Sequence, residues 1–311
     1  MNFNFERKNI DFVKHRKKFF ILPAIVAMIG IILLSTIGLN LGIDFESGSR
    51  VEVMNEEGSF TEEEVQNAFE AAGGYEPDDI TLAGDDHEQA HARFIGVLDQ
   101  NEIAEIQTYF DEEYGAEPSV STVSPQVGQE LAMNALISVL IASVGIIIYV
   151  SIRFELLYGL AAILALAHDA FFIITVFSIT QLEVNVPFIA AVLTIVGYSI
   201  NDTIVTFDRI RENMQKAEKL ETFADLSQVV NHSLLQTLAR SINTVLTVVF
   251  AAGAIFLLGG QGIQTFAFAL LIGLVAGTYS SLFLASQVWL VWKHKQLERQ
   301  RQKAAAKEAE A

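Results

Sequence analysis

Six apolar runs, each long enough to cross a lipid bilayer, limit what this chain can fold into more than any other feature. A helix needs about 20 apolar residues to span roughly 30 Å of hydrocarbon, and it satisfies its own backbone there. The sequence therefore predicts an α-helical polytopic membrane protein with six transmembrane helices. The expected spans are 19–39, 131–150, 156–179, 186–207, 234–258 and 264–292, with tails at 1–18 and 293–311.

The hydrophilic stretch 40–130, between the first two spans, predicts one small α+β domain. Thr61 and Glu64 form a capping box that opens a helix, and Gly73-Gly74 ends it. Strand-like and helix-like patterns alternate in the order β-α-β-β-α-β, which is the order of a ferredoxin-like domain. The expected strands are 49–54, 79–84, 92–98 and 119–123, and the expected helices are 61–72 and 99–115.

The charges are distributed so unevenly that they predict the orientation in the membrane. The stretch 40–130 holds 23 acidic residues and only two basic ones, Arg50 and Arg93. If both termini are cytoplasmic, 17 of the 20 Lys and Arg residues lie in cytoplasmic segments and Arg240 lies within a span. This agreement with the positive-inside rule places the acidic domain outside the cytoplasm. The long, charged stretch 1–18 is not a cleavable signal peptide, so the first span should remain as an anchor.

Asp202 and Arg240 are the most informative charged residues, because they lie inside consecutive spans. An ionisable side chain at membrane depth costs a few kcal/mol or more, so it needs a partner, a proton or a water path. Both residues are expected roughly 8–9 Å inside the cytoplasmic boundary, where antiparallel helices would bring them together. A carboxylate that exchanges a proton beside an arginine is the basic part of an ion-driven machine. The alternatives are a static ion pair or an arginine that reaches the interface.

His168 and Asp169 are adjacent ionisable residues near the middle of the third span. Histidine titrates near physiological pH, so the two could belong to a proton relay. They could equally be a polar patch that holds helices together. Asn201 is a further polar residue beside Asp202, and it could line a wet path or bond between helices.

Two stretches resemble the SecF-type subunits of the bacterial SecD/SecF family, a branch of the RND superfamily. They are GYSINDTIVTFDRIREN at 197–213 and SLLQTLARSINT at 233–244. The resemblance implies half of an RND-type bundle, with the other six helices supplied by SecD. It also implies an accessory subunit beside the SecYEG translocon, where the proton or sodium motive force promotes late steps of preprotein translocation. Ion coupling would involve Asp202 and Arg240, and the location would be the bacterial cytoplasmic membrane.

Two structural motifs of the family also have counterparts. The family carries a Gly-Ile-Asp-Phe-x-Gly-Gly type motif after its first span, and GIDFESGS at 42–49 matches it at Gly42, Asp44, Phe45 and Gly48. Ser47 replaces the first of the paired glycines, so we expect the turn to be kept with a less relaxed backbone. The second motif, at the start of the second span, matches the family at Pro125 and Gly128.

Other function classes find less support in the sequence. There is no Walker motif, no G-x-S-x-G, no cysteine and no helical metal-ligand pair, so we expect no enzyme, no cofactor and no metal site. The basic tails are explained by topology, so no nucleic-acid partner is expected. An ion-coupled small-molecule exporter would need a substrate domain larger than about 80 residues. A membrane-anchored sensor would need no charges inside its spans. The partners expected instead are SecD, SecYEG, the translocating preprotein and the lipid bilayer.

Overall fold

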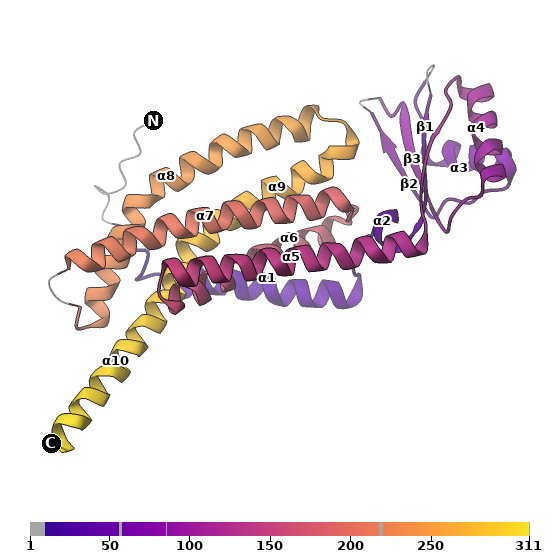
Figure 1. Cartoon of the computed structure of the whole chain (residues 1–311). Coiled ribbons are helices and arrows are strands. Elements are labelled where there is room, and N and C mark those ends of the chain that lie inside the picture. Colours follow the sequence, from indigo (N-terminus) through magenta and orange to yellow (C-terminus); the bar gives the residue numbers. More distant parts are fainter. Residues whose placement is uncertain (1–9, 56–57, 85, 218–219, 311) are drawn as a thin grey trace. The chain divides into compact units, whose positions relative to one another are not determined.

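The computed structural model describes residues 10–55, 58–84, 86–217 and 220–310, which form two compact units (Figure 1). The helical unit contains the described residues up to Leu39 together with 139–182 and those from Pro187 onward. The sheet unit contains 40–138 and the short segment Glu183–Val186. In the described part of the chain, six helical stretches are long and apolar enough to cross a membrane, as the six apolar runs predict.

The helices extend beyond several of the apolar runs. α7 continues past 207, through charged residues, to Lys216. α8 begins at Phe223 and not at 234, and Thr222 and Asp225 form a capping box at its start. The last helix continues to Glu310, since the stretch after 293 is rich in Ala, Lys, Gln and Glu and has no Gly or Pro. The bounds are α1 (Arg16–Thr36), α5 (Pro125–Arg153), α6 (Leu156–Thr180), α7 (Val186–Lys216), α8 (Phe223–Leu258), α9 (Gln261–Tyr279) and α10 (Ser286–Glu310).

The sixth apolar run is not a single regular helix. A π-helical segment, Ser280–Ala285, joins α9 to α10. A π-helical turn holds more residues than an α-helical turn, so it changes which side chains face the neighbouring helices, and such turns are frequent at functional sites. Here Ser280 and Ser281 are both fully buried. The π-helical segment therefore directs two hydroxyl groups into the core of the helical unit.

The core of the helical unit combines aromatic stacking with close helix contacts. Trp289 stacks on Tyr158 with ring centroids 4.6 Å apart, and Phe207 packs edge-on against Tyr158 at 4.8 Å. A Cβ atom at Gly273 would collide with Ile195 and Ile173, so glycine lets α9 approach α7 and α6 closely. Gly273 and Gly277 have the Gly-x-x-x-Gly spacing that is typical of such close contacts.

The sheet unit has the ferredoxin-like order that the sequence predicts. Its four antiparallel strands lie in the order β2-β3-β1-β4, and α3 and α4 pack on one face, where their apolar residues join one core (Figure 1). Both helices begin with a capping box, at Thr61 and at Asp99, and both end at a left-handed glycine. The bounds are β1 (Gly48–Met54), α3 (Glu62–Gly73), β2 (Asp79–Ala83), β3 (Gln89–Ile95), α4 (Gln100–Tyr114) and β4 (Ser119–Val123).

The turn before β1 differs in detail from the expectation. A short helix, α2 (Ile43–Glu46), ends at Ser47, whose φ of 62° and ψ of 141° lie in a region that favours glycine. The turn is therefore kept, and its strain falls on the serine. Gly48 does not have a positive φ; it is needed because a Cβ atom there would collide with the carbonyl oxygen of Phe94 on β3.

Candidate functional site

Asp202 lies on α7 with one carboxylate oxygen paired and the other unpaired. Its Oδ1 accepts a hydrogen bond of 2.6 Å from the Ser241 hydroxyl on α8. Its Oδ2 is buried and has no hydrogen-bond partner among the residues that the structure describes. The direct partner of Asp202 is thus Ser241, whereas the sequence analysis expected Arg240. A buried oxygen without a donor favours a proton, a water molecule or a cation at that position.

Asp202 and Arg240 nevertheless share one cavity. This cavity has a volume of about 70 Å³ and lies between α7, α8 and α9, which is room for a few water molecules. Asn201, the third residue expected here, also lines it, as do several other polar side chains. The polar lining residues are Tyr198, Ser199, Asn201, Asp202, Arg240, Thr244 and Thr278.

The cavity lies at an exposed face of the helical unit. Arg240 and Asn201 are exposed in the isolated chain. Large apolar residues of the same three helices are exposed as well: Tyr198 at 41%, Phe250 at 75% and Val275 at 61%. An arginine facing hydrocarbon at membrane depth is costly, so this face needs a cover of protein or water.

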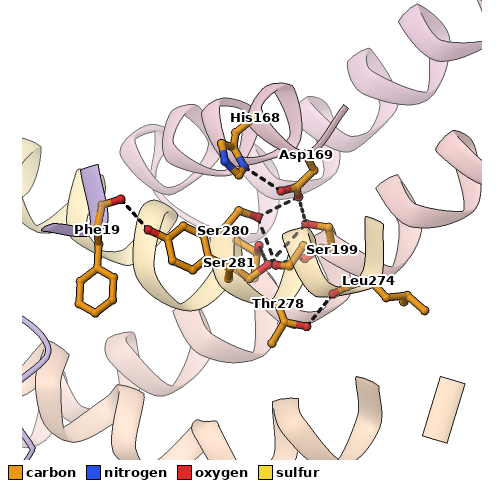
Figure 2. Close-up of polar contacts among 11 residues, drawn as sticks. Phe19, His168, Asp169, Ser199, Leu274, Thr278, Ser280 and Ser281 are labelled. Carbon is orange, nitrogen blue, oxygen red and sulfur yellow. Dashed lines mark hydrogen bonds and ion pairs between the residues drawn. The ribbon is translucent and has the colours of Figure 1, made fainter. Parts of the chain in front are cut away.

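Asp169 is the centre of a second polar cluster (Figure 2), in which Asp169, Ser199 and Ser280 are buried and His168 is half-buried. Its Oδ2 accepts hydrogen bonds from the Ser199 hydroxyl on α7 at 2.5 Å and from the Ser280 hydroxyl at 2.8 Å. Nδ1 of His168 lies 3.1 Å from Asp169 Oδ1. Three polar groups therefore compensate the carboxylate, which is 1% exposed. Without them, burying a charged carboxylate at this depth would be prohibitive.

Hydroxyl groups extend this cluster along the π-helical segment. The Ser281 hydroxyl donates to the backbone oxygen of Ser199 at 3.0 Å and lies 2.8 Å from the Thr203 hydroxyl. Ser199 also lines the cavity that contains Asp202. Its side chain therefore stands between the two carboxylates: it bonds to Asp169 and borders the space around Asp202. The sequence analysis did not single out Thr203 or Ser241, although a polar residue inside an apolar run is a signal for both.

The two structural motifs meet in the sheet unit. Pro125 begins α5, and Gly128 packs against the backbone of Asp44, Phe45 and Ser47, with about 3.5 Å of room for a Cβ atom. Asp44 accepts a hydrogen bond of 2.9 Å from the backbone N–H of Val186, the first residue of α7. The structure thus brings the motif residues together around α2 and the segment that enters α7.

Comparison with known proteins identifies this combination of six helices and one ferredoxin-like domain. Residues 104–295 match the family model of the protein export membrane proteins SecD/SecF, C-terminal region, and residues 32–54 match the SecD/SecF GG motif. The chain belongs to the SecD/SecF family. The GG motif match includes Ser47 and Gly48.

Members of the SecD/SecF family resemble the chain over most of its length. It is 56% identical over 289 residues to the protein translocase subunit SecDF of Bacillus subtilis, covering 93% of this chain but 39% of that protein. It is 40% identical over 298 residues to the protein translocase subunit SecF of Alicyclobacillus acidocaldarius, covering 94% of this chain and 96% of that protein. The chain therefore spans about two fifths of a SecDF protein and nearly all of a SecF protein.

A solved structure of the same family has the same fold. The crystal structure of SecDF from Thermus thermophilus, described as a translocon-associated membrane protein, superposes with a TM-score of 0.83 at 33% identity. The match covers 93% of this chain and 39% of that chain. A second SecDF structure, in a super-membrane-facing form, matches with a TM-score of 0.64 at 31% identity. The six helices thus correspond to part of the RND-like fold of SecDF.

Proposed function

We propose that this chain is an accessory subunit of the Sec protein translocase. With a SecD partner it would use the proton or sodium motive force to promote late steps of preprotein translocation across the cytoplasmic membrane. Family membership supports this assignment, because the relatives are named as translocase subunits and one of them joins SecD and SecF in a single chain. The acidic sheet unit would lie outside the cytoplasm, both termini inside, and the chain would act without catalysing a covalent reaction.

The unpaired oxygen of Asp202 in a cavity with polar walls is the observation that supports ion coupling. Ser241 holds one carboxylate oxygen, while the other is buried and lacks a donor. Asp202 can therefore alternate between two states, with and without a proton or cation, and water in the cavity would deliver the ion. Arg240, lining the same cavity, would favour the unloaded, negative state. A potential of 100 mV supplies about 2.3 kcal/mol per charge, which is enough to bias a two-state element.

The Asp169 cluster would extend the ion path away from Asp202. Ser199 borders the cavity and donates to Asp169, so its hydroxyl would release its proton to Asp169 while its oxygen accepts another from a water molecule in the cavity beside Asp202. His168 would then exchange a proton with Asp169 across 3.1 Å. The components of the proposed coupling site are Asp202, Arg240, Asn201, His168 and Asp169.

The exposed face around Arg240 supports SecD as the partner. It combines polar cavity residues with large exposed apolar side chains, which a second helical bundle would cover. SecYEG and the preprotein would be reached through the assembled complex, and lipid would surround the remaining apolar surface.

Co-purification tests this assignment. We expect the tagged chain, extracted in mild detergent from its own cells, to bring down a SecD protein and SecYEG, and its deletion to slow export of a secreted reporter. A tagged membrane protein of unrelated fold and equal abundance is the control. Normal export in the deletion strain, together with no SecD in the eluate, would refute the assignment.

The relay is tested by His168→Asn. Asparagine keeps a polar group beside Asp169 but cannot carry a proton, so we expect export stimulation to fall about tenfold or more. His232→Asn is the matched control, because His232 is exposed on α8 and bonds to Gln236. If His168→Asn exports as well as the parent, His168 serves in packing and not in a proton relay.

A further inference from the structure

The segment between α6 and α7 is built into the sheet unit. Leu41 and Val184 form a parallel β-bridge. The backbone N–H of Val184 donates to the Asn40 carbonyl at 2.8 Å, and that of Gly42 donates to the Val184 carbonyl at 2.9 Å. Val184 is buried. Two stretches far apart in the sequence are thus joined by main-chain hydrogen bonds at the base of this unit.

The same segment is also where α7 begins. The Asp44 carboxylate accepts a hydrogen bond of 2.9 Å from the backbone N–H of Val186, the first residue of α7. A negative group at a helix N-terminus satisfies an otherwise unpaired donor and interacts favourably with the helix dipole. From Val186 the helix continues without interruption to Lys216, so Asp44 holds one end of the helix that carries Asp202.

Both basic residues of the acidic stretch 40–130 are used at this junction. Arg50 on β1 and Arg93 on β3 lie directly opposite each other in the strand register. Like charges in that position repel, so the arrangement needs a compensating interaction. Arg50 forms an ion pair with Glu183, and Arg93 donates to the Leu41 carbonyl at 2.5 Å. Each arginine therefore binds one of the two bridged stretches.

Gly42 makes room for the ion pair. A Cβ atom at this position would collide with the carboxylate of Glu183. Gly42, the first glycine of the motif, is therefore needed because the Glu183 carboxylate lies so close to it. Its backbone conformation does not require glycine, since φ −76° and ψ 171° are ordinary extended values. This observation links the motif to a residue more than a hundred positions away in the sequence.

The ion pair between Arg50 and Glu183 adds little to stability. Burial raises the pKa of Glu183, and the charges of Arg50 and Arg93 oppose that rise while Asp44 adds to it. A raised pKa means that the environment disfavours the charged carboxylate even with its partner present. Such a pair is better explained by a requirement for one geometry than by a gain in folding free energy.

We propose that Arg50 and Glu183 are positioning residues that clasp the start of α7 to the sheet unit, so that movement of α7 is transmitted to that unit. This proposal rests on the proposed function, in which Asp202 alternates between two ion states, and it adds that this alternation moves α7. Without the clasp, the short connection from α6 to α7 would absorb the movement. The clasp consists of the side chains of Asp44, Arg50 and Glu183 and the main-chain groups of Leu41, Gly42, Val184 and Val186, which a change of side chain at Leu41 or Val184 leaves in place.

A reversible covalent replacement of the ion pair tests the proposal. Glu183→Gln in the full-length chain should insert and bind SecD like the parent, while its stimulation of export falls at least several-fold. The chain has no cysteine, so Leu41→Cys with Val184→Cys introduces a unique pair, and bridged residues lie within disulfide range. We expect this disulfide to restore export to the Glu183→Gln chain and reduction to remove the rescue. The cysteine pair alone, with Glu183 intact, should export normally in both redox states.

Three results would overturn the proposed clasp. Normal export by Glu183→Gln, or no rescue by a disulfide confirmed on a gel, would overturn the clasp. Loss of export when the disulfide forms beside intact Glu183 would also overturn it, because the segment would then have to open. Stimulation of export by the parental chain and by Asp202→Asn is measured in parallel. If the parental chain itself does not stimulate export, the result contradicts the proposed function and not the clasp.

Discussion

Asp202→Asn is expected to insert and bind SecD like the parent, yet to export a secreted reporter no faster than cells that lack the chain. Asparagine has nearly the size of aspartate and can still accept the hydrogen bond from Ser241, so packing between α7 and α8 should survive. It carries neither the charge nor the exchangeable proton that the unpaired Oδ2 would take up. The site then has no group that takes up and releases an ion, so the whole ion-driven contribution should be lost.

The matched control for Asp202→Asn lies on the same helix. Glu212→Gln makes the same chemical change at an exposed site, where Glu212 pairs with Lys216 at 2.7 Å and with Arg209 at 2.9 Å. Exposed pairs of this kind contribute roughly 0–1 kcal/mol, so export should stay near the parental rate. Arg240→Met should resemble Asp202→Asn, because it removes the positive charge from the cavity. Parental export by Asp202→Asn would end the ion-coupling proposal and leave family membership untouched.

Exchanges at the two consecutive residues of the GG motif are expected to change stability in opposite directions. Gly48→Ala places a methyl group against the Phe94 carbonyl, so β1 must move away from β3, at a cost of about 1–3 kcal/mol. Ser47→Gly removes a strained backbone conformation at φ 62°, which is worth about 1–3 kcal/mol, less up to ~1 kcal/mol for the freedom of glycine in the unfolded chain. Thermal unfolding of the purified full-length variants, followed by circular dichroism, measures both effects.

The pair of GG-motif variants contains its own control. Ser47→Ala removes the hydroxyl but keeps the Cβ atom, so it should leave the strain, and therefore the melting temperature, nearly unchanged. A rise for Ser47→Ala equal to that for Ser47→Gly would show that the hydroxyl, and not the backbone, limits stability. An unchanged melting temperature for Gly48→Ala would mean that β1 can move away from β3 without a loss of stability. That result would contradict the close contact between Gly48 and the Phe94 carbonyl in the paired strands.

Local patterns in the sequence were sufficient for most of the architecture. Helical spans follow from the length of apolar runs, because hydrocarbon leaves a single chain segment no other way to satisfy its backbone. The capping box at Thr61 and the left-handed Gly74 and Gly115 follow from short-range hydrogen bonding and sterics, so the ends of α3 and α4 were predictable. Hydrophobic alternation predicted the four strands for the same reason, although β3 (Gln89–Ile95) begins and ends three residues before the expected range 92–98.

The coupling site was only partly predictable. Asp202, Arg240, His168 and Asp169 stand out because ionisable residues are rare inside apolar runs, whatever their partners. Their hydrogen-bond partners depend on how the helices are rotated and how closely they approach. Ser241, rather than Arg240, therefore bonds to Asp202, and the π-helical segment directs Ser280 toward Asp169. The sequence analysis treated the last span as one regular helix, and no local pattern marks the extra residue in its turn.

The sequence by itself determined that this chain is a six-span membrane protein with a ferredoxin-like domain and buried charges, because each of those features depends on the chemistry of neighbouring residues. Only the tertiary structure decided which polar groups meet. Arg50 and Glu183 are 133 residues apart in the sequence, with α3, α4, α5 and α6 between them, and their contact exists because two distant backbone stretches form a β-bridge. Such pairings are set by packing between elements, which a linear pattern of residue types does not encode.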